Sequence, residues 1–114
     1  MKRKLPEQIE LGGHVITIRR VDNLLDTHEA YGLFDPTHLK IEIDGSLNNT
    51  MAWETLWHEV VEAINFFSEA GIEHKSIQVF GLLLHQVANS MFTFKRSAGA
   101  TTKRSAAKPK DTSV

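Results

Sequence analysis

The chain has 114 residues, 41% of them hydrophobic, and a net charge of −1 at pH 7. This length gives room for one domain with one modest core and excludes a multi-domain enzyme. Because cysteine is absent, disulfides, thiolate metal sites and a cysteine nucleophile are excluded, and any metal ion must be held by histidine and carboxylate groups. With no signal segment and no long apolar run, the sequence predicts a cytoplasmic protein without a membrane-spanning helix.

The small net charge hides an uneven distribution. Residues 1–94 carry 7 Lys/Arg against 13 Asp/Glu, a net charge of −6, whereas residues 95–114 carry 6 against 1, a net charge of +5. The tail is rich in Ala, Ser, Thr, Lys and Arg, and too poor in large apolar residues to offset the entropy lost on ordering. We therefore predict a domain over residues 1–96 and a disordered basic tail over residues 97–114. The acidic body argues against nucleic acid as the main partner.

The first half of the chain predicts β-structure. Residues 14–21 are largely β-branched and lie between Gly12-Gly13 and Asp22-Asn23, which is typical of a strand, and residues 9–11 can form a short strand before that turn. Residues 32–34 and 38–44 predict a second β region, interrupted by a turn at Asp35-Pro36. In the second of these segments Leu39, Ile41 and Ile43 alternate with polar residues and should share one face.

The second half changes to a helical period. Residues 48–50 offer side chains for a helix N-cap, and large apolar residues recur at spacings of three and four over residues 50–70. Gly71 should end this helix. A second helix is expected from about residue 73 to 94, with an apolar stripe of Ile77, Phe80, Leu84, Val87 and Met91. Strands followed by helices predict an α+β domain with a small, mainly antiparallel sheet of about three strands.

The first helix carries the residues with the strongest chemical pattern. At 100° per residue, His58 and Glu62 face the same side, one turn apart. An imidazole and a carboxylate at this spacing can bind one Zn²⁺. Glu59 lies next to His58, where the zinc-peptidase motif H-E-x-x-H has the glutamate that activates a water molecule. Here the motif is H-E-x-x-E, and the same spacing also suits a simple surface pair.

A third metal ligand is expected from the second helix. His74 follows the Gly71 break and can return over His58 and Glu62; Glu73 and His85 are the alternatives, although His85 is better explained by helix packing. A group that stabilises an oxyanion could be Tyr31, His85 or Arg96. The remaining histidines, His14, His28 and His38, lie in the β half and are interpreted as surface residues.

The stretches T-L-W-H-E-V-V-E-A-I (residues 55–64) and G-I-E-H-K-S-I (residues 71–77) resemble small phage-encoded zincin-like metallopeptidase-type proteins. The resemblance covers roughly residues 9–90. It implies that His58 and Glu62 are zinc ligands, that Glu59 is the catalytic base, and that residues 40–43 form an edge strand that pairs with an extended substrate. It also implies a phage origin and a bacterial host cytoplasm.

Together these features predict a zinc-dependent hydrolase that cleaves a peptide or amide bond in a peptide or protein substrate. Glu62 replaces the second histidine of the better-known motif, and its negative charge should raise the pKa of a zinc-activated water. A non-catalytic protein that binds a host factor, with the metal ion structural or absent, is the alternative. The small domain is also compatible with a homodimer.

Overall fold

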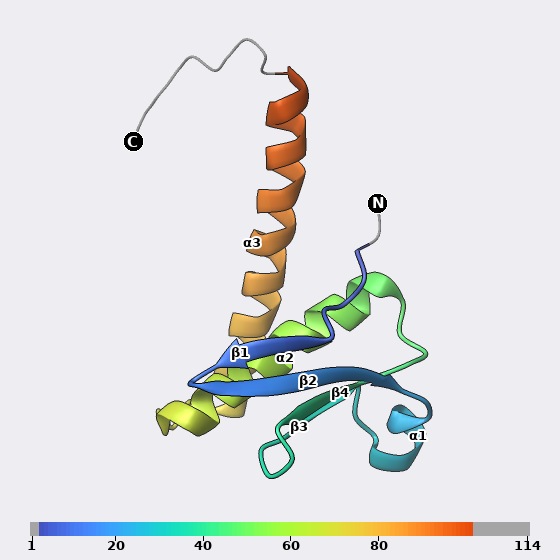
Figure 1. The fold of residues 1–114 in the computed structure, drawn as a ribbon, viewed down its shortest axis with the longest axis vertical. Helices are drawn as coiled ribbons and strands as arrows, with labels where there is room; N and C mark the ends of the chain where they lie inside the picture. The colour runs from blue at the N-terminus through green and yellow to red at the C-terminus, as the bar shows by residue number, and fades with distance from the viewer. Residues whose placement is uncertain (1–2, 102–114) are drawn as a thin grey trace.

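The computed structural model describes residues 3–101 of the chain, with side chains up to residue 92. A four-stranded sheet in the order β1-β2-β4-β3 is covered on one face by helix α2, and helix α3 packs against α2 (Figure 1). The elements are β1 (Gln8–Leu11), β2 (His14–Val21), α1 (Leu24–His28), β3 (Gly32–Asp35), β4 (Lys40–Asp44), α2 (Asn49–Ser68) and α3 (His74–Thr101). The predicted α+β class is confirmed. The sheet has four strands instead of about three, each at one of the predicted β segments, and the short helix α1 was not predicted.

Strands β1 and β2 form an antiparallel hairpin with Ile9 opposite Ile16 and Leu11 opposite His14. The turn consists of Gly12 and Gly13, both with positive φ (61° and 83°). A two-residue turn with positive φ at both positions matches the twist of the flanking strands, and glycine adopts it without strain.

The centre of the sheet differs from the prediction. Strand β2 pairs with β4 in parallel, with Ile18 opposite Ile41, and β3 pairs with β4 antiparallel. Since β4 has a neighbour on both sides, the expectation that residues 40–43 form an edge strand is wrong. The edge strand beside α2 is β3, which contacts that helix.

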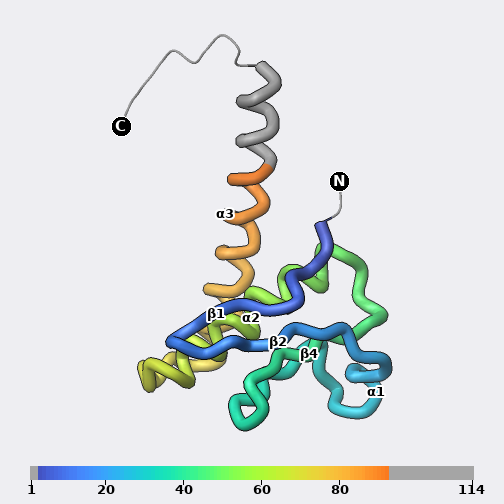
Figure 2. Tube along the Cα trace, viewed as in Figure 1, coloured from blue at the N-terminus to red at the C-terminus, as the bar shows by residue number. Residues whose placement is uncertain are grey.

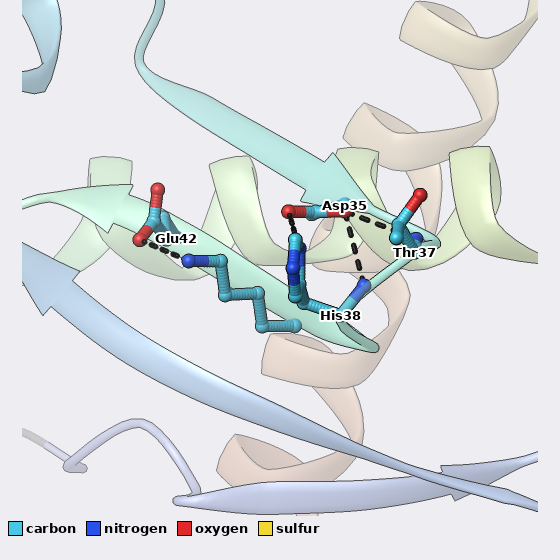
Figure 3. A network of polar contacts seen from close by, with 5 residues as sticks. Asp35, Thr37, His38 and Glu42 are labelled. Atoms are coloured by element: carbon cyan, nitrogen blue, oxygen red, sulfur yellow. Dashed lines mark hydrogen bonds and ion pairs between the residues drawn. The ribbon is translucent and has the colours of Figure 1, made fainter.

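The turn between β3 and β4 is held by Asp35 (Figure 3). Its Oδ1 accepts hydrogen bonds from the backbone N–H groups of Thr37 at 3.0 Å and His38 at 3.2 Å, and its Oδ2 lies 2.9 Å from His38 Nδ1. The hydrogen bond with the His38 side chain is the main reason why the pKa of Asp35 is lowered. The predicted interruption at Asp35-Pro36 is therefore a turn that is stabilised by hydrogen bonds to the Asp35 side chain and that connects β3 to β4.

The core lies between the sheet and α2. Ile16, Ile41 and Ile43 are fully buried, and each such side chain contributes about 1.5–3 kcal/mol on leaving water. They pack with Ala52 and Leu56 of α2. The predicted alternation in β4 holds for Ile41 and Ile43, but Leu39 lies in the turn before the strand with a φ of 52°.

Helix α2 begins as its sequence predicts. The side chain of Asn48 accepts a 2.9 Å hydrogen bond from the N–H of Met51, which satisfies one of the free donors of the first turn. The helix ends at Ser68, and Glu69 rather than glycine adopts the left-handed conformation after it, with a φ of 54°. Gly71 (φ 70°) lies in the connection to α3.

Helix α3 is longer than predicted and faces α2 with different residues. It continues to Thr101, inside the segment expected to be a disordered tail, while residues 102–114 lie outside the described residues. Its buried positions are Ile77, Gly81 and His85, so that of the predicted apolar stripe only Ile77 is buried. The trace in Figure 2 shows α3 crossing α2 and then leaving the rest of the domain. No helix in the described part of the chain is long and apolar enough to cross a membrane.

Candidate metal centre

His58, Glu62 and His74 converge at the crossing of α2 and α3. Oε2 of Glu62 lies 3.3 Å from Nε2 of His58 and 3.3 Å from Nδ1 of His74. One donor atom from each residue lies within 4.8 Å of the other two, and the imidazole rings are 5.3 Å apart in an edge-to-face arrangement. The His58 side chain is 21% exposed, that of Glu62 30% and that of His74 67%. The structure thus brings together the three residues predicted as ligands.

The connection between the two helices fixes the position of His74. The side-chain amide of Asn65 in α2 accepts a 2.8 Å hydrogen bond from the N–H of Ile72 and donates a longer one, 3.4 Å, to its carbonyl oxygen. Ile72 lies two residues before His74, which is the first residue of α3. Asn65 therefore fastens the returning chain one turn beyond Glu62, and the imidazole of His74 lies over that carboxylate.

Two glycines allow other elements to approach the site closely. A Cβ atom on Gly81 of α3 would lie 2.9 Å from Cα of His58, so that only glycine permits this helix crossing without a shift of the backbone. On the other side of α2, a Cβ atom on Gly32 of β3 would lie 2.6 Å from Cγ2 of Thr55 and 3.2 Å from Cγ of Glu59. The helix segment that carries the site is thus held between α3 and β3.

Glu59 lies beside the candidate metal-ligand cluster of His58, Glu62 and His74, in a different environment. Glu59 is only 7% exposed. Burial, together with the negative charge of Glu62, raises the pKa of the Glu59 carboxyl group to about 7. A carboxyl group with a pKa near neutrality can both accept and release a proton at pH 7. A carboxyl group in this environment can serve as a general acid or base.

The cluster opens into a cleft of about 710 Å³ between β3, α2 and α3. Four of the residues that line it are acidic, namely Glu29, Glu54, Glu59 and Glu62, and none of the described lining residues is Lys or Arg. The wall formed by residues 29–34 includes the start of the edge strand β3. This volume is typical of a small-molecule or peptide site, and its charge favours cations.

The other candidates from the sequence lie apart from the cluster, with one exception. Tyr31 lines the cleft and is half exposed. His85 is buried in a separate cavity of about 260 Å³, with Nε2 3.4 Å from Nδ2 of Asn89, consistent with a packing role. Glu73 is absent from the lining of the cleft, and the side chain of Arg96 lies outside the described residues.

The histidines of the β half lie outside this cluster. His14 stacks on Phe67 with ring centroids 4.9 Å apart, His28 lies 2.9 Å from the hydroxyl of Thr27, and His38 pairs with Asp35.

Sequence reasoning missed the residues that position the site. Asn65 lies one turn beyond Glu62 on the same helix face, but an asparagine amide does not belong to the metal-ligand pattern that directed attention to His58 and Glu62. Gly81 interrupts an apolar helical run, Phe80-Gly81-Leu82. An isolated glycine in such a run is a signal of close helix packing that the sequence did contain.

Neither protein-family models, nor curated protein sequences, nor solved structures give a match to this chain.

Proposed function

We propose that the protein is a zinc-dependent hydrolase that cleaves peptide or amide bonds. The observation that carries the proposal is the convergence of three donor atoms from His58, Glu62 and His74 beside a buried carboxyl group, Glu59, whose pKa is raised to about 7. Two nitrogen donors and one carboxylate form a ligand set typical of catalytic zinc sites, which leave a fourth position free for water or substrate.

Two of the three donor separations have the length expected for zinc, and the third, between the two imidazole nitrogens, is within 4.8 Å. Two atoms bound to one Zn²⁺ at about 2.1 Å in tetrahedral geometry are about 3.4 Å apart. The distances from Oε2 of Glu62 to the two imidazole nitrogens are both 3.3 Å. Because the chain has no cysteine, thiolate ligands are excluded. The acidic residues that line the cleft favour a divalent cation. Zinc bound here would polarise a carbonyl group and lower the pKa of a water molecule.

In this proposal Glu59 is the catalytic base. Its carboxylate accepts a proton from the attacking water, and the resulting acid delivers that proton to the leaving amine. Without a metal ion, burial and the charge of Glu62 raise its pKa to about 7; a zinc ion bound to Glu62 would lower this pKa and favour the carboxylate that accepts the proton. Tyr31, which lines the same cleft, is the candidate donor to the developing oxyanion.

The substrate we propose is an extended peptide that adds to the free edge of β3. That strand pairs with β4 on one side only, and residues 29–34 form one wall of the cleft. Backbone pairing with an edge strand binds a peptide with little sequence preference. The two other carboxylates of the cleft, Glu29 and Glu54, then favour peptides with Lys or Arg near the scissile bond over peptides with Asp or Glu.

A cytoplasmic location, in a bacterial host if the protein is phage-encoded, is part of the proposal. It rests on the absence of cysteine, which suits a reducing compartment, and on the resemblance described above.

The test is hydrolysis of a quenched-fluorescence peptide library by the zinc-loaded protein. Glu59→Gln should retain zinc and lower kcat by about 100-fold or more, since it removes the proton acceptor. Glu73→Gln, an exposed carboxylate of the same connection, should keep wild-type turnover. No turnover of any library member by a zinc-loaded wild-type protein would contradict the proposal and favour the non-catalytic binding protein.

A further inference from the structure

One face of α3 is apolar and has no partner among the residues that the structure describes. Five side chains on it, Phe80, Leu83, Leu84, Val87 and Met91, are between 39% and 63% exposed. At 100° per residue they fall within an arc of about 100° on the helix. The face that packs on α2 is a neighbouring one, marked by Ile77, Gly81 and His85. We call these five side chains the α3 stripe.

Four residues of the α3 stripe, together with Ile77, have the spacing of a coiled-coil seam. Residues 77, 80, 84, 87 and 91 follow one another at intervals of three, four, three and four, which is the a/d pattern of heptads. Such a seam is completed by a second helix that inserts its own side chains between those of the first. In the single chain α2 covers only Ile77 of this series, and the rest of the seam faces solvent.

The charges point to another copy of the same helix as the partner. Residues 76–92 contain no Asp, Glu, Lys or Arg. Two such helices meet without like-charge repulsion, and charge depletion is typical of the core of a protein interface. The basic tail, with its Lys, Arg, Ser and Thr residues, lacks the apolar side chains needed to fill the seam. A membrane surface is also a poor fit, because residues 76–92 lack the Lys and Arg residues that flank the apolar face of a membrane-binding helix.

The exposed area is sufficient for a dimer. The five side chains together expose about 500 Å², more than the few hundred Å² of apolar patch that monomers usually show. Two copies would bury at most about 1,000 Å² through these side chains, which is the lower limit of a specific interface, and flanking residues add to it. We propose that the protein forms a homodimer in which α3 pairs with α3 of a second copy along the α3 stripe.

The dimer leaves the proposed metal centre free. The α3 residues that line the cleft, His74, Gln78 and Leu82, lie on the side of the helix away from the α3 stripe. Association therefore does not depend on zinc, and this inference stands or falls separately from the proposed function.

Sedimentation equilibrium tests the inference on the full chain between 1 and 200 μM, on the order of the concentrations where interfaces of this size associate. The wild type should show twice the chain mass of 12.8 kDa, with or without EDTA. The double variant Leu84→Glu/Val87→Glu should show the chain mass throughout, a loss of affinity of about 100-fold or more. The control Gln86→Glu adds one such negative charge outside the α3 stripe and should dimerise like the wild type.

A second measurement covers the case in which the double variant fails to fold. Since the chain has no cysteine, Val87→Cys introduces a single thiol, which should form a disulfide-linked dimer under mild oxidation. Gln86→Cys should not. A wild type with the chain mass over the whole range, or equal cross-linking by both cysteine variants, would overturn the inference.

Discussion

The side-chain amide of Asn65 binds both the N–H and the carbonyl oxygen of Ile72, at 2.8 Å and 3.4 Å. This pair ties the end of α2 to the residues just before α3. The position of His74, the most exposed member of the metal-ligand cluster, therefore depends on a residue that does not itself contact the proposed metal ion.

Asn65→Ala should weaken zinc binding without removing a ligand. The variant loses both hydrogen bonds to Ile72, so His74 is held less firmly over Glu62, and zinc affinity should fall by about 10-fold to 100-fold. Competition with a chromogenic zinc chelator measures this. Ser68→Ala, exposed and nearby on the same helix, is the matched control and should bind zinc like the wild type. Unchanged affinity in Asn65→Ala would contradict the positioning role.

Gly81→Ala should destabilise the protein, opposite to the usual effect of this substitution in a helix. At an ordinary helical position the change gains about 1 kcal/mol. Here the new Cβ would meet Cα of His58 at 2.9 Å, so α3 must move away from α2. We expect a loss of about 1–3 kcal/mol in the free energy of unfolding by urea, typical of overpacking. A gain in stability would mean that the helices are not in close contact at this point.

Glu59 should make the metal-free protein less stable as pH rises. Its folded pKa of about 7 lies above the ordinary value of 4.5, so the folded state binds more protons between these pH values. Stability is therefore highest below pH 4.5 for this group and falls until about pH 7, by about 3 kcal/mol in total. Urea unfolding in EDTA at pH 5 and pH 8 should show this loss in the wild type.

Glu59→Gln removes the group that titrates and should show a smaller loss of stability over the same pH range. The difference between the two pH dependences isolates Glu59 from the histidines, which both proteins share. Glu73→Gln is the control and should follow the wild type. Parallel pH dependences for wild type and Glu59→Gln would show that Glu59 is not buried as described.

Asp44 should have the opposite effect on the pH dependence of stability: it should make the protein more stable as pH rises. It is almost fully buried and accepts hydrogen bonds from the hydroxyl and N–H of Ser46 and from the N–H of Leu25. These bonds, that of the Ser46 side chain first, lower the pKa of Asp44. Its contribution is present above the ordinary value of 3.8 and is lost as pH falls through the lower folded pKa.

Asp44→Asn should therefore have a lower thermal midpoint than the wild type at pH 7. Between pH 4 and pH 2 the midpoint of the variant should fall by less than that of the wild type. The exposed Asp26→Asn should leave both the midpoint and its acid dependence unchanged. Equal midpoints of wild type and Asp44→Asn at pH 7 would show that these bonds do not stabilise the fold.

Local features of the structure could be predicted from the sequence. Strand β2, the Asn48 cap and the shared face of His58 and Glu62 depend on neighbouring residues, and the structure has all three. Strand order depends on contacts between distant segments, so the parallel pairing of β2 with β4 and the edge position of β3 were not predicted. The buried face of α3 was predicted incorrectly because close packing there uses Gly81 and His85, which do not match an apolar pattern.

The candidate site could also be predicted where it depends on residues close together in the sequence. His58, Glu59 and Glu62 belong to one helical turn, and His74 was inferred from the returning chain. The raised pKa of Glu59 could not be predicted, because it results from burial against β3 at Gly32, on a strand far away in the sequence.

Zinc content tests the central claim most directly. The protein is incubated with zinc, freed of excess metal by gel filtration and measured by mass spectrometry, together with Glu62→Ala, His74→Ala and the control Glu73→Ala. We expect about one zinc ion per chain for wild type and Glu73→Ala, and much less for the other two variants. A wild type that takes up no zinc, or a His74→Ala variant that binds it as the wild type does, would contradict the account.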